Sequence, residues 1–224
     1  MTDDGFESRV SKVGALTDPI RRALYHFVAY QPGAVSRDQA AAGIDVPRHT
    51  AKFHLDKLVD EGLLVTEFKR LTGRSGPGAG RPAKLYRRAR KEVNVTLPRR
   101  RYDLAGHVLA DAASRALDGV AMDTALRDAA DNAAEVVLES WPPEHDDAAT
   151  NLRDVLTKLG YEPRTDGDAL SLFNCPFRQL SDDHEELICA MNVDFIRALG
   201  QRLGRDRLAV IRVERGSGCC IRIA

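Results

Sequence analysis

The chain of 224 residues is long enough for one large domain or two modest ones, and with 43% apolar residues it can bury a core. Its formal net charge is zero, but residues 1–101 carry 20 Lys and Arg against 11 Asp and Glu, whereas residues 102–224 carry 13 against 22. The composition argues against a disordered chain. The charge asymmetry predicts a basic half that meets a polyanion and an acidic half with another task.

The N-terminal sequence MTDDGFESRV lacks the basic and apolar regions of a signal peptide, and no apolar run approaches the roughly 20 residues of a membrane span. We therefore expect a cytoplasmic protein without membrane contact. All four cysteines follow residue 174, a distribution that argues against the disulfide framework of a secreted domain. It predicts a local site or simple packing.

The stretch LTDPIRRALYHFVAY, residues 16–30, predicts an amphipathic helix. Possible N-cap residues precede Pro19, which suits the first helical position, and apolar residues follow at three-to-four spacing. A shorter second helix opens with Ser36 three residues before Gln39, which is the spacing of a capping box, and a glycine ends it.

The stretch VPRHTAKFHLDKLVDEG, residues 46–62, predicts a third helix with an apolar stripe at i, i+4, i+7 and i+8 from Ala51. Two short helices joined by a tight turn, the second with a polar and partly basic outward face, form the helix-turn-helix pattern. At 100° per residue, the side chains that project away from the stripe are His49, Thr50, Phe53 and Lys57.

The stretches LLVTEFKRL and AKLYRRA predict two paired strands, and the connection TGRSGPGAGRP is rich in glycine and carries Arg74 and Arg81. Such a hairpin is typical of a wing, because glycine lets the backbone lie close to a duplex while guanidinium groups grip phosphates or enter the minor groove. Taken singly, these motifs are compatible with a protein-interaction module or a solvated linker. Their order, their short connections and the basic excess together favour DNA binding.

The stretches LTDPIRRALYHFV, RHTAKFHLDKLVDEGLL and GPGAGRPAKLYRR resemble the winged-helix domain of bacterial ArsR-type repressors, and more closely the branch that includes the repressor of the iron–sulfur cluster assembly (Suf) operon. The resemblance covers about residues 14–91 and continues more loosely to the end. It implies a homodimer that reads a palindromic operator in double-stranded DNA. It also implies DNA contacts from Arg48, His49, Thr50, Lys52 and Phe53 in the recognition helix and from Arg74, Arg81 and Lys84 in the wing.

Two aromatic side chains of the recognition helix have alternative interpretations. His54 either packs, between helix and wing or at a dimer edge, or contacts DNA. Phe53 either touches a thymine methyl group or inserts into the wing, and we favour the contact with DNA.

After the wing, residues 95–117 and 122–141 are alanine-rich and apolar at helical spacing, which predicts two helices packed on one another. We interpret this segment as a dimer seam in preference to a cofactor groove, because a long helix after the wing commonly pairs with its twin in multi-helix sensors. From residue 151 the pattern changes to a helix, alternating strands, another helix and two final strands. This order indicates an α+β domain.

The predicted fold class is mostly α with α+β. We expect an N-terminal winged helix-turn-helix domain at residues 1–95, a helical linker and dimerisation segment at 96–145, and a cysteine-containing α+β sensor domain at 146–224. A final hairpin turn at Gly216 and Gly218 would place two adjacent cysteines at the start of the last strand.

The cysteines Cys175, Cys189, Cys219 and Cys220 include no CxxC pair, so their spacing does not indicate a zinc ribbon. Thiolates from three separate elements can hold an iron–sulfur cluster or a soft metal, with a fourth ligand from the second vicinal cysteine, from His184 or from a small-molecule thiol. The alternative is packing, because free cysteine is among the most often buried residue types. The Suf-repressor resemblance implies three ligands, namely Cys175, Cys189 and either Cys219 or Cys220, although the spacings and the vicinal pair differ from that pattern.

We therefore predict a DNA-binding transcriptional regulator, a repressor, whose C-terminal cysteines sense an iron–sulfur cluster, a metal or the thiol redox state. The alternative is the same regulator with structural cysteines and a small organic effector between the α+β elements. A remote alternative is a thiol-dependent enzyme that uses Cys175 or Cys189. We expect no enzyme, because His184 lies about 140° around a helix from Cys189 and no phosphate loop or carboxylate pair accompanies them.

Overall fold

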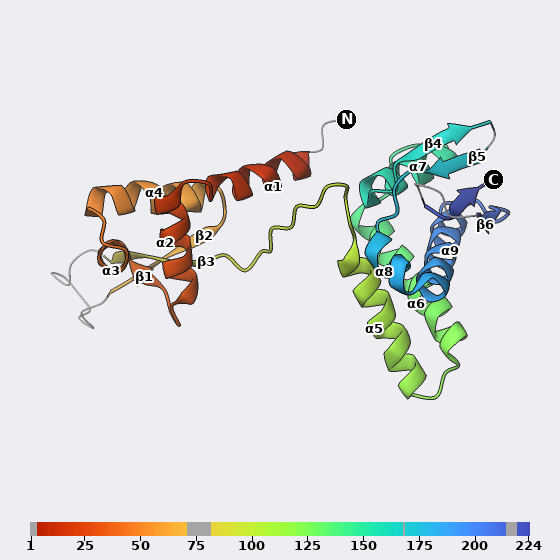
Figure 1. The fold of residues 1–224 in the computed structure, drawn as a ribbon, viewed down its shortest axis with the longest axis horizontal. Helices are drawn as coiled ribbons and strands as arrows, with labels where there is room; N and C mark the ends of the chain where they lie inside the picture. Colours follow the sequence, from red (N-terminus) through yellow and green to blue (C-terminus); the bar gives the residue numbers. More distant parts are fainter. Residues whose placement is uncertain (1–3, 71–81, 168, 214–218) are drawn as a thin grey trace. The chain divides into compact units, whose positions relative to one another are not determined.

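The computed structural model of the protein describes residues 4–70, 82–167, 169–213 and 219–224. The chain divides into two compact units, Met1–Val95 and Thr96–Ala224. Both units are mainly helical, and each contains a small antiparallel sheet (Figure 1). The predicted fold class is confirmed. Within the described residues, no helix is both long enough and apolar enough to cross a membrane.

The first unit combines helices with a short sheet. Its elements are α1 (Asp4–Ala15), α2 (Pro19–Tyr30), β1 (Val35–Ser36), α3 (Arg37–Gly43), α4 (Arg48–Asp60), β2 (Leu64–Lys69) and β3 (Ala83–Arg88). β3 is the middle strand of the sheet, and both of its neighbours are antiparallel to it. Tyr86 of β3 therefore lies opposite Val35 of β1 on one side and Thr66 of β2 on the other.

Local capping sets the ends of the helices in the first unit. The Asp18 carboxylate accepts a hydrogen bond from the backbone N–H of Arg21 at 2.9 Å, at the start of α2. Ser36 and Gln39 form the predicted capping box of α3. Gly62, which follows α4, has a φ of 70°, a conformation that glycine adopts without strain. Because these signals are local, the three helices predicted from this part of the sequence are confirmed.

One apolar core holds the first unit together. Leu24 of α2 and Leu55 and Leu58 of α4 are fully buried in it, and complete burial of a leucine contributes about 1.5–3 kcal/mol. α3 and α2 approach each other closely where Gly43 meets Phe27, since a Cβ atom at Gly43 would collide with the phenyl ring. The apolar stripe predicted for the third helix therefore faces this core.

The second unit contains the longest described helices and a four-stranded sheet. Its elements are α5 (Tyr102–Leu117), α6 (Met122–Ser140), α7 (Ala148–Leu159), β4 (Pro163–Asp166), β5 (Ala169–Leu172), α8 (Arg178–Asp183), α9 (Glu185–Arg202), β6 (Val210–Arg212) and β7 (Ile221–Ile223). The strand order is β4-β5-β7-β6, and every neighbouring pair is antiparallel. The last strand therefore lies inside the sheet, between β5 and β6.

A single apolar core joins the helices and the sheet of the second unit. α6 packs against both α5 and α9 (Figure 1), and Leu156, Phe177 and Phe195 are almost completely buried. Residues 96–145 and residues 146–224 were expected to form separate segments. In the structure, both segments contribute side chains to the same core.

Some elements differ from the sequence-based expectations. α1 and β1 were not predicted, and α8 is a separate short helix before α9. Cys219 and Cys220 were expected to start the last strand, but β7 begins at Ile221 because its pairing with β6 starts there. The hairpin turn predicted at Gly216 and Gly218 lies outside the described residues.

Candidate DNA-binding surface and thiol cluster

Helix α4 has two different faces. Ala51, Leu55 and Leu58 on one face are fully buried in the core of the first unit. Among the contact residues predicted on this helix, Thr50 is half-buried and the others are exposed, namely Arg48, His49, Lys52, Phe53 and Lys57. The helix is thus held through its apolar side, while its polar and basic side is available to a partner.

Two adjacent aromatic residues of α4 differ sharply in exposure. Phe53 is 66% exposed and His54 only 9%, and their ring centroids lie 5.1 Å apart in an edge-to-face arrangement. Nδ1 of His54 lies 4.0 Å from the Asp18 carboxylate at the start of α2. The position of His54 agrees with the packing interpretation, whereas Phe53 remains accessible at the surface.

The Asp56 carboxylate connects α4 to strand β3 of the wing. It accepts hydrogen bonds from Lys84 Nζ at 2.6 Å and from the Tyr86 hydroxyl at 2.9 Å, and it pairs with Lys52 Nζ at 3.2 Å. Burial acts to raise the pKa of Asp56, but these hydrogen bonds outweigh burial and hold the pKa below its ordinary value. Burial, reinforced by the bond to Asp56, raises the pKa of Tyr86. One carboxylate therefore holds two candidate DNA ligands, Lys52 and Lys84, close together.

Two further basic residues of α4 also pair with carboxylates. Arg48 Nη2 lies 3.1 Å from Asp38 Oδ2, and Lys57 Nζ lies 3.3 Å from Glu61 Oε1. Ion pairs with this degree of solvent exposure each contribute only about 0–1 kcal/mol to the stability of the fold. The phosphates of a duplex can therefore replace these carboxylates at little cost.

The wing is described only in part. Arg74 and Arg81, which were predicted to contact DNA, lie outside the described residues. Lys84 lies on β3, and together with Arg37 and Lys52 it lines a cavity of about 560 Å³ between α3, α4 and the wing strands. Basic side chains from the helices and from the wing thus share one concave surface.

The four cysteines come from three separate parts of the second unit. Cys175 follows β5, Cys189 lies in α9, and Cys219 and Cys220 precede β7. All four thiols are free and buried, with exposed fractions between 1% and 8%. The structure therefore brings the predicted thiol ligands into one buried neighbourhood.

One pair of thiols is in close contact, and the others lie beside it. Cys189 Sγ lies 2.7 Å from Cys220 Sγ, and Cys219 interacts with both Cys175 and Cys220. Hydrogen bonds from Cys219 lower the pKa of both Cys175 and Cys220. The pKa of Cys219 is raised by its bonds to these neighbours, and burial raises the pKa of Cys189. The cluster thus contains both thiolate-favouring and thiol-favouring positions.

Buried polar groups surround part of the thiol cluster. Asn192 Nδ2 lies 3.6 Å from Cys219 Sγ, and the Asn192 side-chain oxygen accepts a hydrogen bond from the Tyr161 hydroxyl at 2.5 Å. Both residues are almost completely buried. Because buried amides and hydroxyls need partners, this chain of contacts holds Cys219 in a defined position.

The thiol sulfurs are suitable metal ligands, but their positions in the structure do not match those of ligands around one metal ion. Four thiol sulfurs are the donors that soft metals and iron–sulfur clusters prefer. However, two thiolates on one tetrahedral ion with bonds of about 2.3 Å are about 3.8 Å apart, whereas the Cys189 and Cys220 sulfurs are separated by 2.7 Å. In the part of the chain that the structure describes, no three His, Cys, Asp or Glu side chains are placed to hold one metal ion.

Asn174 ties the loop that carries Cys175 to the start of the second unit. Its amide nitrogen donates to the Arg99 carbonyl at 3.0 Å, and its amide oxygen accepts from Arg100 Nη1 at 2.5 Å. The same Arg100 nitrogen donates to the Cys175 carbonyl at 2.8 Å. Since the two arginines lie only a few residues after the boundary between the units, the thiol-bearing loop is bonded to the segment through which the chain enters this unit.

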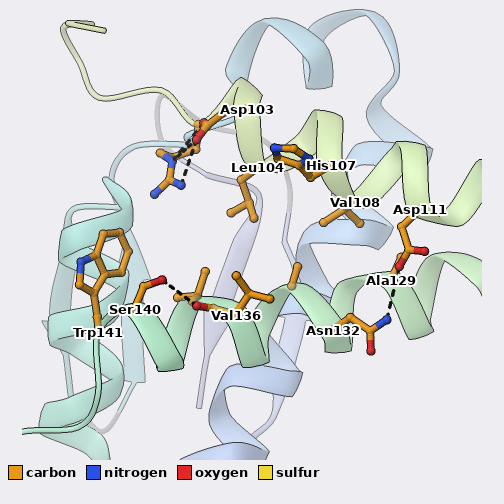
Figure 2. Close-up of a pocket in the computed structure, with 13 residues that line it drawn as sticks. Asp103, Leu104, His107, Val108, Asp111, Ala129, Asn132, Val136, Ser140 and Trp141 are labelled. Atoms are coloured by element: carbon orange, nitrogen blue, oxygen red, sulfur yellow. Dashed lines mark hydrogen bonds and ion pairs between the residues drawn. The ribbon is translucent and has the colours of Figure 1, made fainter. Parts of the chain in front are cut away.

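A groove of about 510 Å³ lies between α5 and α6 (Figure 2). Leu104 and Val108 of α5 and Val136 of α6 provide apolar side chains to its wall. At one end stands Trp141, with the Arg101 guanidinium 5.7 Å from the centroid of its ring system. Polar side chains from both helices meet at the other end (Figure 2). The groove therefore has the size and the mixed lining of a small-molecule site.

A family model described as a helix-turn-helix domain matches residues 16–67 of the chain. The matched segment contains α2, α3 and α4 and most of β2. No curated protein and no solved structure matches the chain. The match supports a DNA-binding transcriptional regulator, and it includes the exposed basic face of α4.

Three residues of these sites were not predicted from the sequence, namely Asp38, Asp56 and Asn174. Asp56 follows Lys52 by four positions, a spacing at which opposite charges pair on a helix, so this contact was detectable. Asn174 was not detectable in the same way, because its arginine partners lie 74 and 75 residues away in the sequence.

Proposed function

We propose that the protein is a homodimeric transcriptional repressor of the ArsR type, resembling the Suf-operon branch, which binds an operator in double-stranded DNA. The observation that carries this proposal is the exposed basic face of α4 within the matched helix-turn-helix segment. We assign base contacts to Arg48, His49, Thr50 and Phe53, and phosphate contacts to Lys52, Lys57, Arg74, Arg81 and Lys84.

On binding DNA, phosphates compete with carboxylates for the basic side chains. Asp38 releases Arg48, and Asp56 shares Lys52 and Lys84 with the phosphate backbone. Each new phosphate contact releases condensed counterions and adds about −0.9 to the slope of log K against log salt. The carboxylates therefore keep the free surface from binding every polyanion tightly, while a matched operator still displaces them.

The dimer explains how an effector controls binding. Half-sites one helical turn apart lie about 34–36 Å from each other, so a small rotation of one α4 against its twin prevents both from docking. We place the dimer contact in residues 96–145, where α5 and α6 expose Leu117 and Val136. An apolar side chain that is mostly exposed in one chain gains free energy when a second copy covers it.

We assign the sensor role to the second unit, through Cys175, Cys189, Cys219 and Cys220. The effector is an iron–sulfur cluster, a metal or the thiol redox state, and the convergence of four buried thiols supports this assignment. The hydrogen bonds of Asn174 supply a path for the signal, because they bind the Cys175 loop to the entry segment of the unit. Binding of a cluster or a metal through Cys189 and Cys220 would require their sulfurs to move apart from 2.7 Å to about 3.8 Å, whereas a change of thiol redox state would not.

Selection from a random library of double-stranded DNA tests the DNA-binding half of the proposal. We expect enrichment of a palindrome whose half-sites lie one helical turn apart, and symmetrical protection of that site in footprinting. A folded protein that enriches no sequence would contradict the assignment of α4 as a recognition helix.

Purification without oxygen tests the sensor half. The visible spectrum, iron and acid-labile sulfide are measured for the wild type and for Cys175→Ser. Matching iron and sulfide that the substitution removes would establish a cluster. A colourless and iron-free wild type that still binds its operator would exclude the cluster and leave another metal, the thiols themselves or an organic ligand as the effector.

The second candidate is a regulator with structural cysteines that senses a small organic molecule. The groove between α5 and α6 favours this candidate, since its volume of about 510 Å³ lies within the range of ligand pockets. A fragment screen that monitors Trp141 fluorescence tests it, because this side chain stands at the end of the groove. Ligands that change the emission and also weaken operator binding would favour the organic effector over the thiols.

A further inference from the structure

The pair formed by Cys189 and Cys220 differs from a set of metal ligands. Their sulfurs are 2.7 Å apart, which is closer to the S–S bond of about 2.0 Å than to the separation of about 3.8 Å imposed by one metal ion. Cys189 lies inside a regular helix, and Cys220 directly precedes a strand held on both sides by the sheet. The contact therefore joins two ordered elements, helix α9 and, through the residue directly before it, strand β7.

We propose that Cys189 and Cys220 form a reversible disulfide, which makes the thiol cluster a dithiol switch. This inference rests on the proposed sensor role of the cysteines and specifies which pair reacts. Cys175 and Cys219 lie beside this pair and interact with Cys220, and they act as neighbours that respond to the change.

The oxidant is a peroxide, and hydrogen peroxide is the simplest example. One thiolate of the pair attacks a peroxide oxygen, the O–O bond breaks, and a sulfenic acid and hydroxide form. The second sulfur then displaces the sulfenic oxygen, which leaves as water when it takes up the proton of the second thiol. The hydroxide takes up the proton of the first thiol. Two thiols and one peroxide thus give one disulfide and two waters.

Burial favours a small oxidant. Cys189 is 1% exposed and Cys220 is 4% exposed. Exchange with another disulfide requires a third sulfur to reach one of the pair, which the surrounding side chains obstruct, whereas a peroxide is little larger than water. For the same reason, the partner thiol captures the sulfenic acid before a second molecule of oxidant reaches it.

Formation of the bond alters the cluster beyond the pair. The hydrogen bond between the two thiols is lost, and α9 becomes covalently tied to the chain just before β7. Cys219 directly precedes Cys220 in the chain and interacts with Cys175, whose carbonyl accepts a hydrogen bond from Arg100. The disulfide therefore alters the environment of Cys219 and Cys175, and through the Arg100 hydrogen bond it reaches the segment where the chain enters the unit.

Disulfide mapping of the full-length protein tests this inference. The fully reduced and chelator-treated protein is exposed to hydrogen peroxide, the remaining thiols are blocked with N-ethylmaleimide, and unreduced peptides are identified by mass spectrometry. We expect a cross-linked peptide containing Cys189 and Cys220, about 2 Da lighter than the two thiols, which disappears after dithiothreitol treatment. Alkylation of Cys175 and Cys219 should persist.

Substitutions sharpen the test. Cys189→Ser and Cys220→Ser should each abolish the cross-link, whereas Cys175→Ser should retain it. Linkage of Cys219 to Cys220 or to Cys175, or complete alkylation of all four thiols after oxidation, would overturn the inference. If the serine variants fail to fold, the wild-type peptide map still decides between these outcomes.

The same samples separate this inference from the proposed function. Mapping involves no DNA, so a missing disulfide refutes the dithiol switch alone. Binding of the reduced protein to a selected duplex tests the regulator independently. If the peptide map shows the disulfide but the protein selects no DNA, the reactive pair is supported and the proposed regulator is contradicted.

Discussion

The two units use their interiors in opposite ways. In the first unit, the described interior is almost entirely apolar, and the candidate functional groups lie outside on α4 and β3. In the second unit, the candidate groups are themselves buried, since the four thiols lie among apolar side chains and near buried amides. The comparison indicates that a surface site tolerates polar substitution without loss of the fold, whereas a buried site couples function to stability.

The largest expected effect comes from the apolar cores, which belong to separate units. Leu55→Ala should destabilise the first unit by about 2–5 kcal/mol, and Leu156→Ala should do the same in the second unit. Trp141, the single tryptophan, reports only on the second unit. We expect its thermal transition to shift with Leu156→Ala and to stay in place with Leu55→Ala, while circular dichroism shows a shift for both. Equal shifts of the Trp141 transition would show that the units unfold together.

Asn174→Ala should have the next largest effect, because it removes a buried hydrogen-bonding hub. The Gly160 carbonyl loses a buried hydrogen bond, and the Arg99 carbonyl and the Arg100 guanidinium each lose a part-buried one. An unsatisfied buried group costs about 1–3 kcal/mol of stability. We expect a lower midpoint of urea unfolding for the second unit. Asn132→Ala at an exposed position of α6 is the matched control and should change the midpoint little. Similar midpoints for the two variants would remove Asn174 from the proposed signal path.

Substitutions on the exposed face of α4 should affect DNA binding and not stability. His49→Ala should reduce discrimination between the operator and a mismatched duplex by about 1–3 kcal/mol. Lys57→Ala should weaken binding to both duplexes alike and make the salt slope shallower by about one unit. Fluorescence anisotropy at several salt concentrations measures both quantities. The assignment fails for His49 if the variant loses affinity equally for both sequences.

Asp56→Asn should strengthen binding to non-specific DNA, because it frees Lys52 and Lys84 from a competing carboxylate. We expect the salt slope to steepen by up to about one unit. Asp60→Asn removes the same charge from an exposed position of the same helix and serves as the control. An identical increase for both variants would attribute the effect to net charge and not to the specific contact.

The smallest expected effect is a dependence of the first unit's stability on acid pH, which arises from Asp18 and Asp56. Asp18 has its pKa lowered by the backbone hydrogen bond from Arg21, and Asp56 has a lowered pKa as well. A lowered pKa stabilises the folded state above the ordinary value of 3.8, and this contribution disappears as the pH falls through the folded-state pKa. Urea midpoints between pH 6 and pH 3 should fall less in the double variant Asp18→Asn, Asp56→Asn than in the wild type.

The sequence by itself determined the helix-turn-helix part of this protein. Asp18 before a proline, the Ser36–Gln39 box and the apolar stripe that includes Leu55 are signals within one or two turns of a helix, so they act before distant contacts form. The exposed face of α4 follows from the same periodicity. The thiols could be proposed as a group only from their types and from a resemblance, because no local pattern states which of them meet.

Only the tertiary structure decided the pairing of Cys189 with Cys220 and the role of Asn174. These contacts span 31 and more than 70 residues, and they depend on how α9, β7 and the Cys175 loop pack in one core. Helical caps and stripes arise from interactions along a few residues, whereas the meeting of buried side chains depends on the burial of the whole unit. That is the physical reason why the DNA-binding surface was readable in the sequence and the thiol pairs were not.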